Sequence, residues 1–224
     1  MTELTAQAPS DLKPVLWKIA GAFALAHVIL LFAGFSQEHS PSHGASLDTI
    51  RRTFVEANLP RVMAGGYVES LSFVVLLPAL VFTARAIGRR TEIGRWAANT
   101  SLAAGTGYVV STLAVGMPAG AAALYGAQHG ADLHTVMVVD DIRNYAFYLS
   151  IALAGAQALA LGVAAISDRI FTRWVGYVGV AVGVLAIGGA ALVPNVASMA
   201  WVVWWVGVAV ALLRPNRQVR IARS

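Results

Sequence analysis

The chain has 224 residues, of which 58% are hydrophobic and only 12% charged, with a formal net charge of +5. A soluble domain carries roughly 25% charged residues, so this composition indicates a membrane protein. Cysteine is absent, which excludes disulfide bonds, thiolate metal sites and cysteine nucleophiles. The basic residues form no run with interleaved aromatics, which argues against nucleic acid as a partner.

Six stretches are apolar and long enough to cross a bilayer as helices. A hydrocarbon core about 30 Å thick needs roughly 20 apolar residues of helix, and the alternation expected of barrel strands is missing. We predict an all-α polytopic membrane bundle that forms one domain over residues 1–224. Its six predicted transmembrane helices are Val15–Phe35, Val62–Ala84, Ala97–Pro118, Tyr145–Ile166, Trp174–Val193 and Val196–Leu213.

Residues 1–13 form a polar, partly acidic N-terminal tail. A secretory signal peptide would begin with basic residues and end at a small-residue cleavage site. Neither feature is found around the first apolar stretch, so we predict that it is a retained transmembrane helix.

The first loop, residues 36–61, is the only long connection between the predicted spans. Within it, Leu47, Ile50, Phe54 and Val55 follow helical spacing, with Ser46 placed as an N-cap. This pattern predicts a short amphipathic helix. Two interpretations remain open: a connector lying in the membrane interface, or a lid over a cavity between the spans.

Glu69 and His27 are the strongly ionisable residues that lie well inside the predicted spans. At a rise of about 1.5 Å per residue, they lie roughly 10 and 12 Å below the same membrane boundary, on consecutive antiparallel helices. A Glu–His pair would ease the burial of both groups. They are therefore the candidate catalytic residues, although an uncharged Glu69 that only holds neighbouring helices together is an equally simple interpretation.

The stretch VMVVDDIRNYAF, residues 136–147, places charged groups just before the fourth predicted span. Counting back from Ile166 puts the membrane edge near Phe147, with Asp140, Asp141 and Arg143 roughly 6–10 Å above it, among the headgroups. Asp140, Arg143 and Asn144 have i,i+3 and i,i+4 spacing, so Asp140 can pair with both on one helix face. We predict either a polar helix start or a ligand- or headgroup-contact site formed by Arg61, Asp140, Asp141, Arg143 and Asn144.

Four of the five histidines lie in the loops on the same side of the predicted bundle as these acids: His39, His43, His129 and His134. Their spacings match no recognised set of metal ligands. We therefore predict neither a metal site nor a cofactor.

Small and aromatic residues mark the third, fifth and sixth predicted spans. Gly176, Gly179 and Gly183, and the pair Gly116 and Gly120, predict close approach of neighbouring helices. Pro194 and Asn195 predict the turn of a helical hairpin. The sixth span contains Trp201, Trp204 and Trp205. We expect these indoles to face lipid or a neighbouring subunit, the latter in a homodimer.

The distribution of Lys and Arg predicts the orientation. The side of the two termini holds twelve of the sixteen basic residues, and the basic tail 214–224 lies on that side. We predict a multi-pass protein of a bacterial cytoplasmic (inner) membrane with both termini in the cytoplasm. The twelve are Lys13, Lys18, Arg85, Arg89, Arg90, Arg95, Arg169, Arg173, Arg214, Arg217, Arg220 and Arg223.

The order of motifs along the second half of the chain resembles a six-helix bacterial integral membrane family known only as a domain of unknown function. The pattern is a D-x-x-N-Y-A-F-like helix start, a long apolar span and then R-W-V-G-Y-V-G. The resemblance implies a fold and a membrane location but no substrate, cofactor or catalytic residue. The matching positions are Asp141, Asn144, Phe147, Arg173, Trp174, Gly176, Gly179 and Gly183.

Three functions remain open from the sequence. The first is a non-enzymatic membrane protein that binds an apolar or lipid-like ligand or a membrane partner. The second is a membrane enzyme acting on a lipid or isoprenoid, with Glu69 as acid or base and His27 as its partner. The third is a small proton-coupled carrier in which Glu69 cycles a proton.

Overall fold

The computed structural model describes residues 14–37, 40–169 and 173–214. The predicted N-terminal tail, His39 and the basic tail beyond Arg214 lie outside these residues. The described chain is helical and contains no strand. Its elements are α1 (Pro14–Phe35), α2 (Leu47–Ile50), the π-helical turn η2 (Arg51–Val55), α3 (Leu59–Ala86), α4 (Glu92–Ser111), the π-helical turn η3 (Thr112–Gly116), α5 (Met117–Gln128), α6 (Leu133–Asp168), α7 (Arg173–Gly189) and α8 (Pro194–Leu213).

Five described helices are long and apolar enough to cross a membrane: α1, α3, the continuous α4–η3–α5 helix of 37 residues, α6 and α8. The remaining apolar helix, α7, has 17 residues, which corresponds to roughly 25 Å. It is therefore shorter than the other five.

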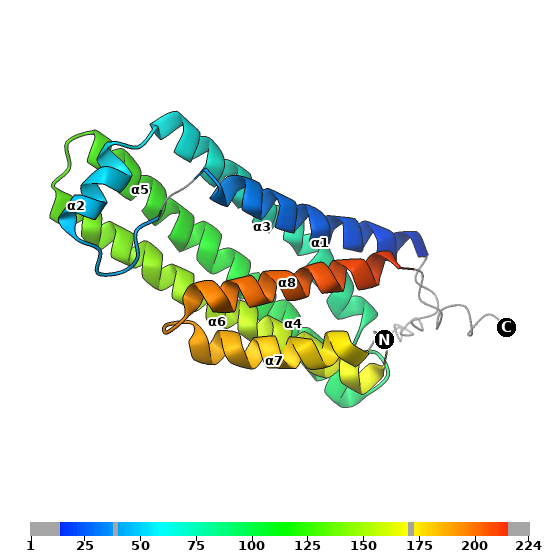
Figure 1. Ribbon diagram of the computed structural model, residues 1–224. Coiled ribbons are helices and arrows are strands. Elements are labelled where there is room, and N and C mark those ends of the chain that lie inside the picture. Colours follow the sequence, from blue (N-terminus) through cyan, green and yellow to red (C-terminus); the bar gives the residue numbers. More distant parts are fainter. Residues whose placement is uncertain (1–13, 38–39, 170–172, 215–224) are drawn as a thin grey trace, which may run out of the picture.

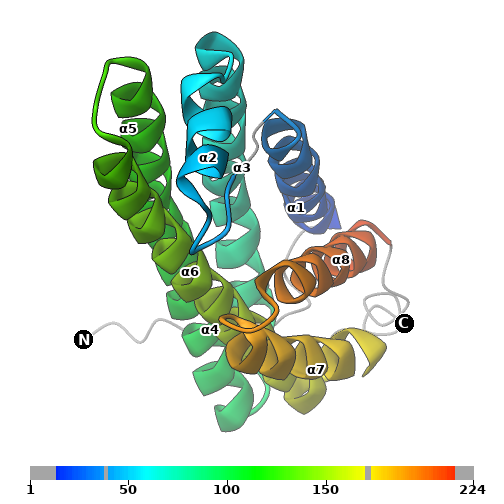
Figure 2. The same ribbon diagram turned by 60° about the vertical axis from the view of Figure 1, so that its left-hand side comes forward.

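The long helices do not all extend equally far. Figure 1 shows that α3, α5 and α6 project beyond α1, α7 and α8 at one end of the bundle, where α2 also lies. We call this the α2 end. In Figure 2, α2 lies between α3 and the pair formed by α5 and α6. The start of α1 and the end of α8 lie at the opposite end (Figure 1).

Side-chain caps start several of the helices, as their sequences favour. Ser46 accepts a hydrogen bond from the amide of Thr49, which agrees with the N-cap predicted for the first loop. Asn58 caps α3 through the amide of Arg61. Asp132 caps α6 through the amides of His134 and Thr135, so that helix begins twelve residues before the predicted span.

A second hydrophobic core holds the first loop at the α2 end. Ile50 and Phe54 are buried there against α5, whereas Val55 is 41% exposed. Gln128 donates hydrogen bonds from Nε2 to the backbone carbonyls of Phe54 and Ala57, at 3.1 and 2.8 Å. Protein therefore covers the apolar side of this segment, and its position relative to a membrane interface stays a prediction.

Pro118 does not end the third span, contrary to the sequence-based boundary. A proline has no amide hydrogen and crowds the carbonyl four residues before it, yet the helix continues through Pro118 to Gln128. The preceding five residues adopt the π-helical turn η3, in which the Thr112 hydroxyl donates to the carbonyl of Tyr108 at 2.9 Å. Irregularities in long helices typically lie at prolines or at π-helical turns, and here the two occur together. Pro194 lies at the true start of α8, where the first turn needs no amide donor, so the hairpin turn lies at residues 190–193.

Gly176 and Gly183 allow the backbones of α6 and α7 to approach closely, as predicted, whereas Gly179 makes room for the indole of Trp204 on α8. A Cβ atom on Gly183 would lie 2.6 Å from both Cβ and the backbone nitrogen of Leu159. Gly116 is different, because its Cβ would meet Ala146 at an ordinary 3.8 Å. The prediction of close helix approach is therefore wrong at Gly116.

The larger hydrophobic core is formed by α1, α3, α4, α6, α7 and α8. The three tryptophans of α8 are buried in it, with at most 2% of each exposed. Trp204 donates from Nε1 to the carbonyl of Val175 on α7 at 3.0 Å. The prediction that these indoles face lipid or another subunit is therefore wrong. Apolar and aromatic side chains suit a protein core as well as a lipid surface, and here they fill the contact between α8 and its neighbours.

Candidate functional site

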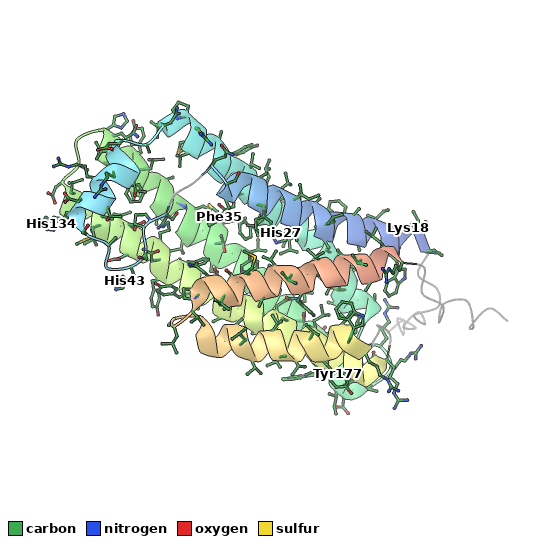
Figure 3. All side chains as sticks on the ribbon, in the orientation of Figure 1. Lys18, His27, Phe35, His43, His134 and Tyr177 are labelled. Atoms are coloured by element: carbon green, nitrogen blue, oxygen red, sulfur yellow. The ribbon has the colours of Figure 1, made fainter. Side chains whose placement is uncertain are left out.

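His27 lies in the middle of α1 (Figure 3) and is completely buried. Its Nδ1 atom lies 2.9 Å from the backbone carbonyl of Ser72 on α3, and only a protonated nitrogen can donate there. Nε2 has no hydrogen-bond partner in the described structure. The rings of Phe73 and Trp201 surround the imidazole, with centroids 5.8 and 5.9 Å away.

A hydrogen-bonded network extends from this aromatic cluster across the bundle. Trp201 donates from Nε1 to Oε1 of Gln157 at 3.2 Å. Gln157 donates from Nε2 to the Ser101 hydroxyl at 3.4 Å, and that hydroxyl donates to the Gln157 carbonyl at 3.1 Å. Buried polar groups need such partners. The network therefore joins α4, α6 and α8 at the level of His27.

Glu69 lies on α3 one turn before the residue that binds His27. Its carbonyl accepts a hydrogen bond from the Ser72 hydroxyl at 2.6 Å, and its backbone packs closely on Gly34 of α1. Neither ring nitrogen of His27 forms a hydrogen bond with the Glu69 carboxylate. The two residues occupy neighbouring turns, but their predicted pairing does not take the form of a direct hydrogen bond.

The polar residues at the start of the fourth predicted span form a buried cluster on α6. Oδ1 of Asp140 lies 2.8 Å from a guanidinium nitrogen of Arg143, and Asn144 donates from Nδ2 to Oδ2 of Asp140 at 3.2 Å. Asp140 is only 1% exposed. The predicted pairing of Asp140 with both neighbours on one helix face is confirmed.

This cluster binds the first loop. Arg143 donates to the hydroxyl of Ser40 and, at 3.1 Å, to the carbonyl of Pro41. Nδ1 of His43 lies 2.7 Å from Oδ1 of Asp141. We call the cluster of Asp140, Asp141, Arg143 and Asn144, together with the contacts that Arg143 and Asp141 make with residues 40–43, the loop clamp. The sequence indicated the α6 half of the clamp through helical spacing, but no local signal pointed to the loop residues.

Arg61 has a different partner from the one expected for a shared site. Its Nε atom donates to Oε1 of Gln37 at 2.7 Å. This bond joins the start of α3 to the residues just after α1. A role for Arg61 in headgroup contact therefore stays a prediction and is separate from the loop clamp.

An open groove of about 440 Å³ lies beside the loop clamp. Its volume falls within the range of roughly 300–1,000 Å³ typical of ligand sites. One wall is apolar and aromatic, and the hydrogen bond between Asp141 and His43 forms its polar edge. The lining residues are His43, Val138, Asp141, Ile142, Tyr145 and Tyr148.

Metal ligation receives no support from the arrangement of side chains. In residues 14–37, 40–169 and 173–214, no three His, Asp or Glu side chains gather where they could hold an ion. His43 is engaged with Asp141, and His129 stacks on Tyr125 with ring centroids 3.9 Å apart.

No family model, no curated protein and no solved structure matches this chain.

Proposed function

We propose that the chain is a multi-pass protein of a bacterial inner membrane that binds a lipid-like ligand in the groove beside the loop clamp. In this proposal α7 is the sixth span, both termini are cytoplasmic and the α2 end faces outward. Five helices of sufficient length and apolarity support membrane insertion. The concentration of Lys and Arg in the predicted loops and tails on the side of the termini supports the orientation.

The position of the groove relative to α7 and α8 carries the ligand proposal. α6 packs on this hairpin as far as Ile151, which shares a small core with Ala186, Ala190 and Ala197. Closer to the α2 end, α6 continues beyond the hairpin. No residue of α7 or α8 lines the groove there. The predicted membrane edge near Phe147 falls within this open stretch. A molecule in the outer leaflet could therefore enter the groove from the side.

The lining of the groove indicates an amphiphilic ligand. Val138, Ile142 and the ring of Tyr145 offer apolar surface, and Tyr145 is 72% exposed. The side chains of Asp141 and His43 and the tyrosine hydroxyl groups supply hydrogen-bonding groups nearby. An acyl or isoprenoid chain attached to a polar headgroup matches this combination.

The enzyme and carrier alternatives both need a path from solvent or lipid to Glu69. Neither Glu69 nor His27 lines the groove. The groove therefore supports binding at the α6 surface better than it supports chemistry at Glu69.

A photoactivatable phosphatidylethanolamine, incorporated into nanodiscs with the protein, tests the proposal. We expect saturable labelling of the peptide that contains residues 138–148. Tyr145→Ala removes the most exposed aromatic wall of the groove, so the concentration for half-saturation should rise about tenfold.

Tyr67→Ala is the matched control, because Tyr67 is an exposed tyrosine of α3 that does not line the groove. It should leave the labelling curve unchanged. Labelling that rises linearly with lipid, or that falls equally in both variants, would contradict ligand binding in the groove. Crosslinks from this peptide to a second protein chain would instead identify a membrane partner.

A further inference from the structure

A second cavity lies at the end of the bundle opposite the α2 end. It has a volume of about 260 Å³ and lies between the end of α6 and the beginning of α7. Figure 3 shows Tyr177, one of its lining residues, at this end of the molecule. The lining residues are Ala165, Ile166, Arg169, Arg173 and Tyr177.

Two arginines give this cavity a net positive charge. Neither Arg169 nor Arg173 forms an ion pair with any residue that the structure describes. Arg173 is also the first residue of α7, and the beginning of a helix adds positive potential through its unpaired amide groups.

The nearest acid in the sequence, Asp168, forms no ion pair with these arginines, because its carboxylate is directed at the beginning of α4. Asp168 is 1% exposed and accepts hydrogen bonds from the amides of Arg90 and Thr91, at 3.0 and 3.1 Å. It also accepts one from the Thr91 hydroxyl at 2.9 Å. These bonds fasten the beginning of α4 to the end of α6. Arg169 then turns the chain in the left-handed conformation, with φ of 54°.

The residues around the two arginines are of the kinds that surround a bound lipid headgroup. Tyr177 lies one turn after Arg173 on α7 and is 61% exposed, and the neighbouring Trp174 is 50% exposed. Exposed Tyr and Trp gather at the level of membrane headgroups. Ala165 and Ile166 add an apolar wall. A free anion needs only the cations, whereas a lipid would also use the apolar and aromatic surface.

We propose that this cavity binds the phosphate of an anionic phospholipid headgroup, with Arg169 and Arg173 as the groups that contact the phosphate. Guanidinium groups form paired hydrogen bonds with phosphate oxygens. Basic pockets between transmembrane helices bind such headgroups in other membrane proteins. This site is separate from the groove on α6, so the two proposals can fail independently.

Native mass spectrometry of the protein released from phosphatidylcholine nanodiscs tests the site. The nanodiscs contain increasing fractions of phosphatidylglycerol, and the number of retained phosphatidylglycerol adducts is measured. Replacing both arginines, R169Q with R173Q, should weaken the tightest adduct about thirtyfold, because each arginine near an anionic lipid contributes about a factor of five. The single variants are measured too, so that poor folding of the double variant does not decide the outcome.

The double variant R85Q with R95Q is the matched control. It removes the same charge from two exposed arginines outside the cavity and should retain the adduct. Equal losses in the two double variants would overturn the proposal, because they would show attraction to surface charge in general. A competition arm adds inorganic phosphate. Displacement of phosphatidylglycerol by an equimolar amount of phosphate would show that the free anion is the ligand, and would overturn the assignment to a lipid.

Discussion

Asp140→Ala is expected to lower the free energy of unfolding by about 3 kcal/mol, because it removes one member of a buried ion pair. Arg143 is only 15% exposed at its side chain and would lose the carboxylate 2.8 Å away. Asn144 would lose its acceptor as well. Thermal unfolding of the detergent-solubilised protein measures the loss. Limited proteolysis should also show faster cleavage within residues 36–61, since Arg143 holds that loop on α6.

The adjacent acid provides the control for this experiment. Asp141 pairs with His43 at 2.7 Å, but their side chains are 34% and 64% exposed. An exposed pair contributes about 0–1 kcal/mol, so Asp141→Ala should change the stability only slightly. Equal losses for the two aspartates would show that burial of the pair has no part in the effect. A double-mutant cycle of Asp140→Ala with Arg143→Ala should show strong coupling.

Gly183→Ala is expected to destabilise the bundle by about 1–3 kcal/mol, the usual cost of forcing extra atoms into a packed contact. The added methyl would lie 2.6 Å from Leu159 and 2.7 Å from the carbonyl of Gly155, on the facing surface of α6. Backbone atoms cannot move aside as the end of a flexible side chain can, so α6 and α7 must separate. Unfolding of the detergent-solubilised protein measures this loss as well.

Gly188→Ala is the matched control on the same helix, since nothing lies within 4 Å of the position of its added Cβ. Alanine favours a helix by about 1 kcal/mol over glycine, so this variant should be as stable as the original protein or slightly more stable. A loss at Gly188 as large as that at Gly183 would show that the glycines act through helix propensity rather than through close packing.

The polar cluster on α6 shows which contacts the residue spacing within one helix can predict and which it cannot. The bonds of Asp140 with Arg143 and Asn144 follow from helix geometry alone, because residues three and four positions apart lie on one face. Ser40, Pro41 and His43 complete the loop clamp from about a hundred positions away. No periodicity or motif connects them to α6, so their role became visible only when the fold placed the first loop there.

His27 and Glu69, the polar residues inside the predicted spans, show a second limit of prediction from the sequence. Their depth on α1 and α3 placed His27 and Glu69 close together, and the bond of His27 to Ser72, one turn from Glu69, agrees with that placement. The actual partners of His27 are a backbone carbonyl and aromatic rings, and the longer network runs through Gln157 and Trp201. A depth count gives a level in the membrane but no direction around the helix.

The sequence by itself determined that this is an all-helical chain with several segments able to cross a membrane. The physical reason is that backbone groups in hydrocarbon must bond within their own segment. Only the tertiary structure decided which face of each segment is covered by protein. Lipid is as apolar as a protein core, so the hydropathy of α8 could not place Trp201, Trp204 and Trp205 inside. The same ambiguity concealed the packing of Ile50 and Phe54 on α5.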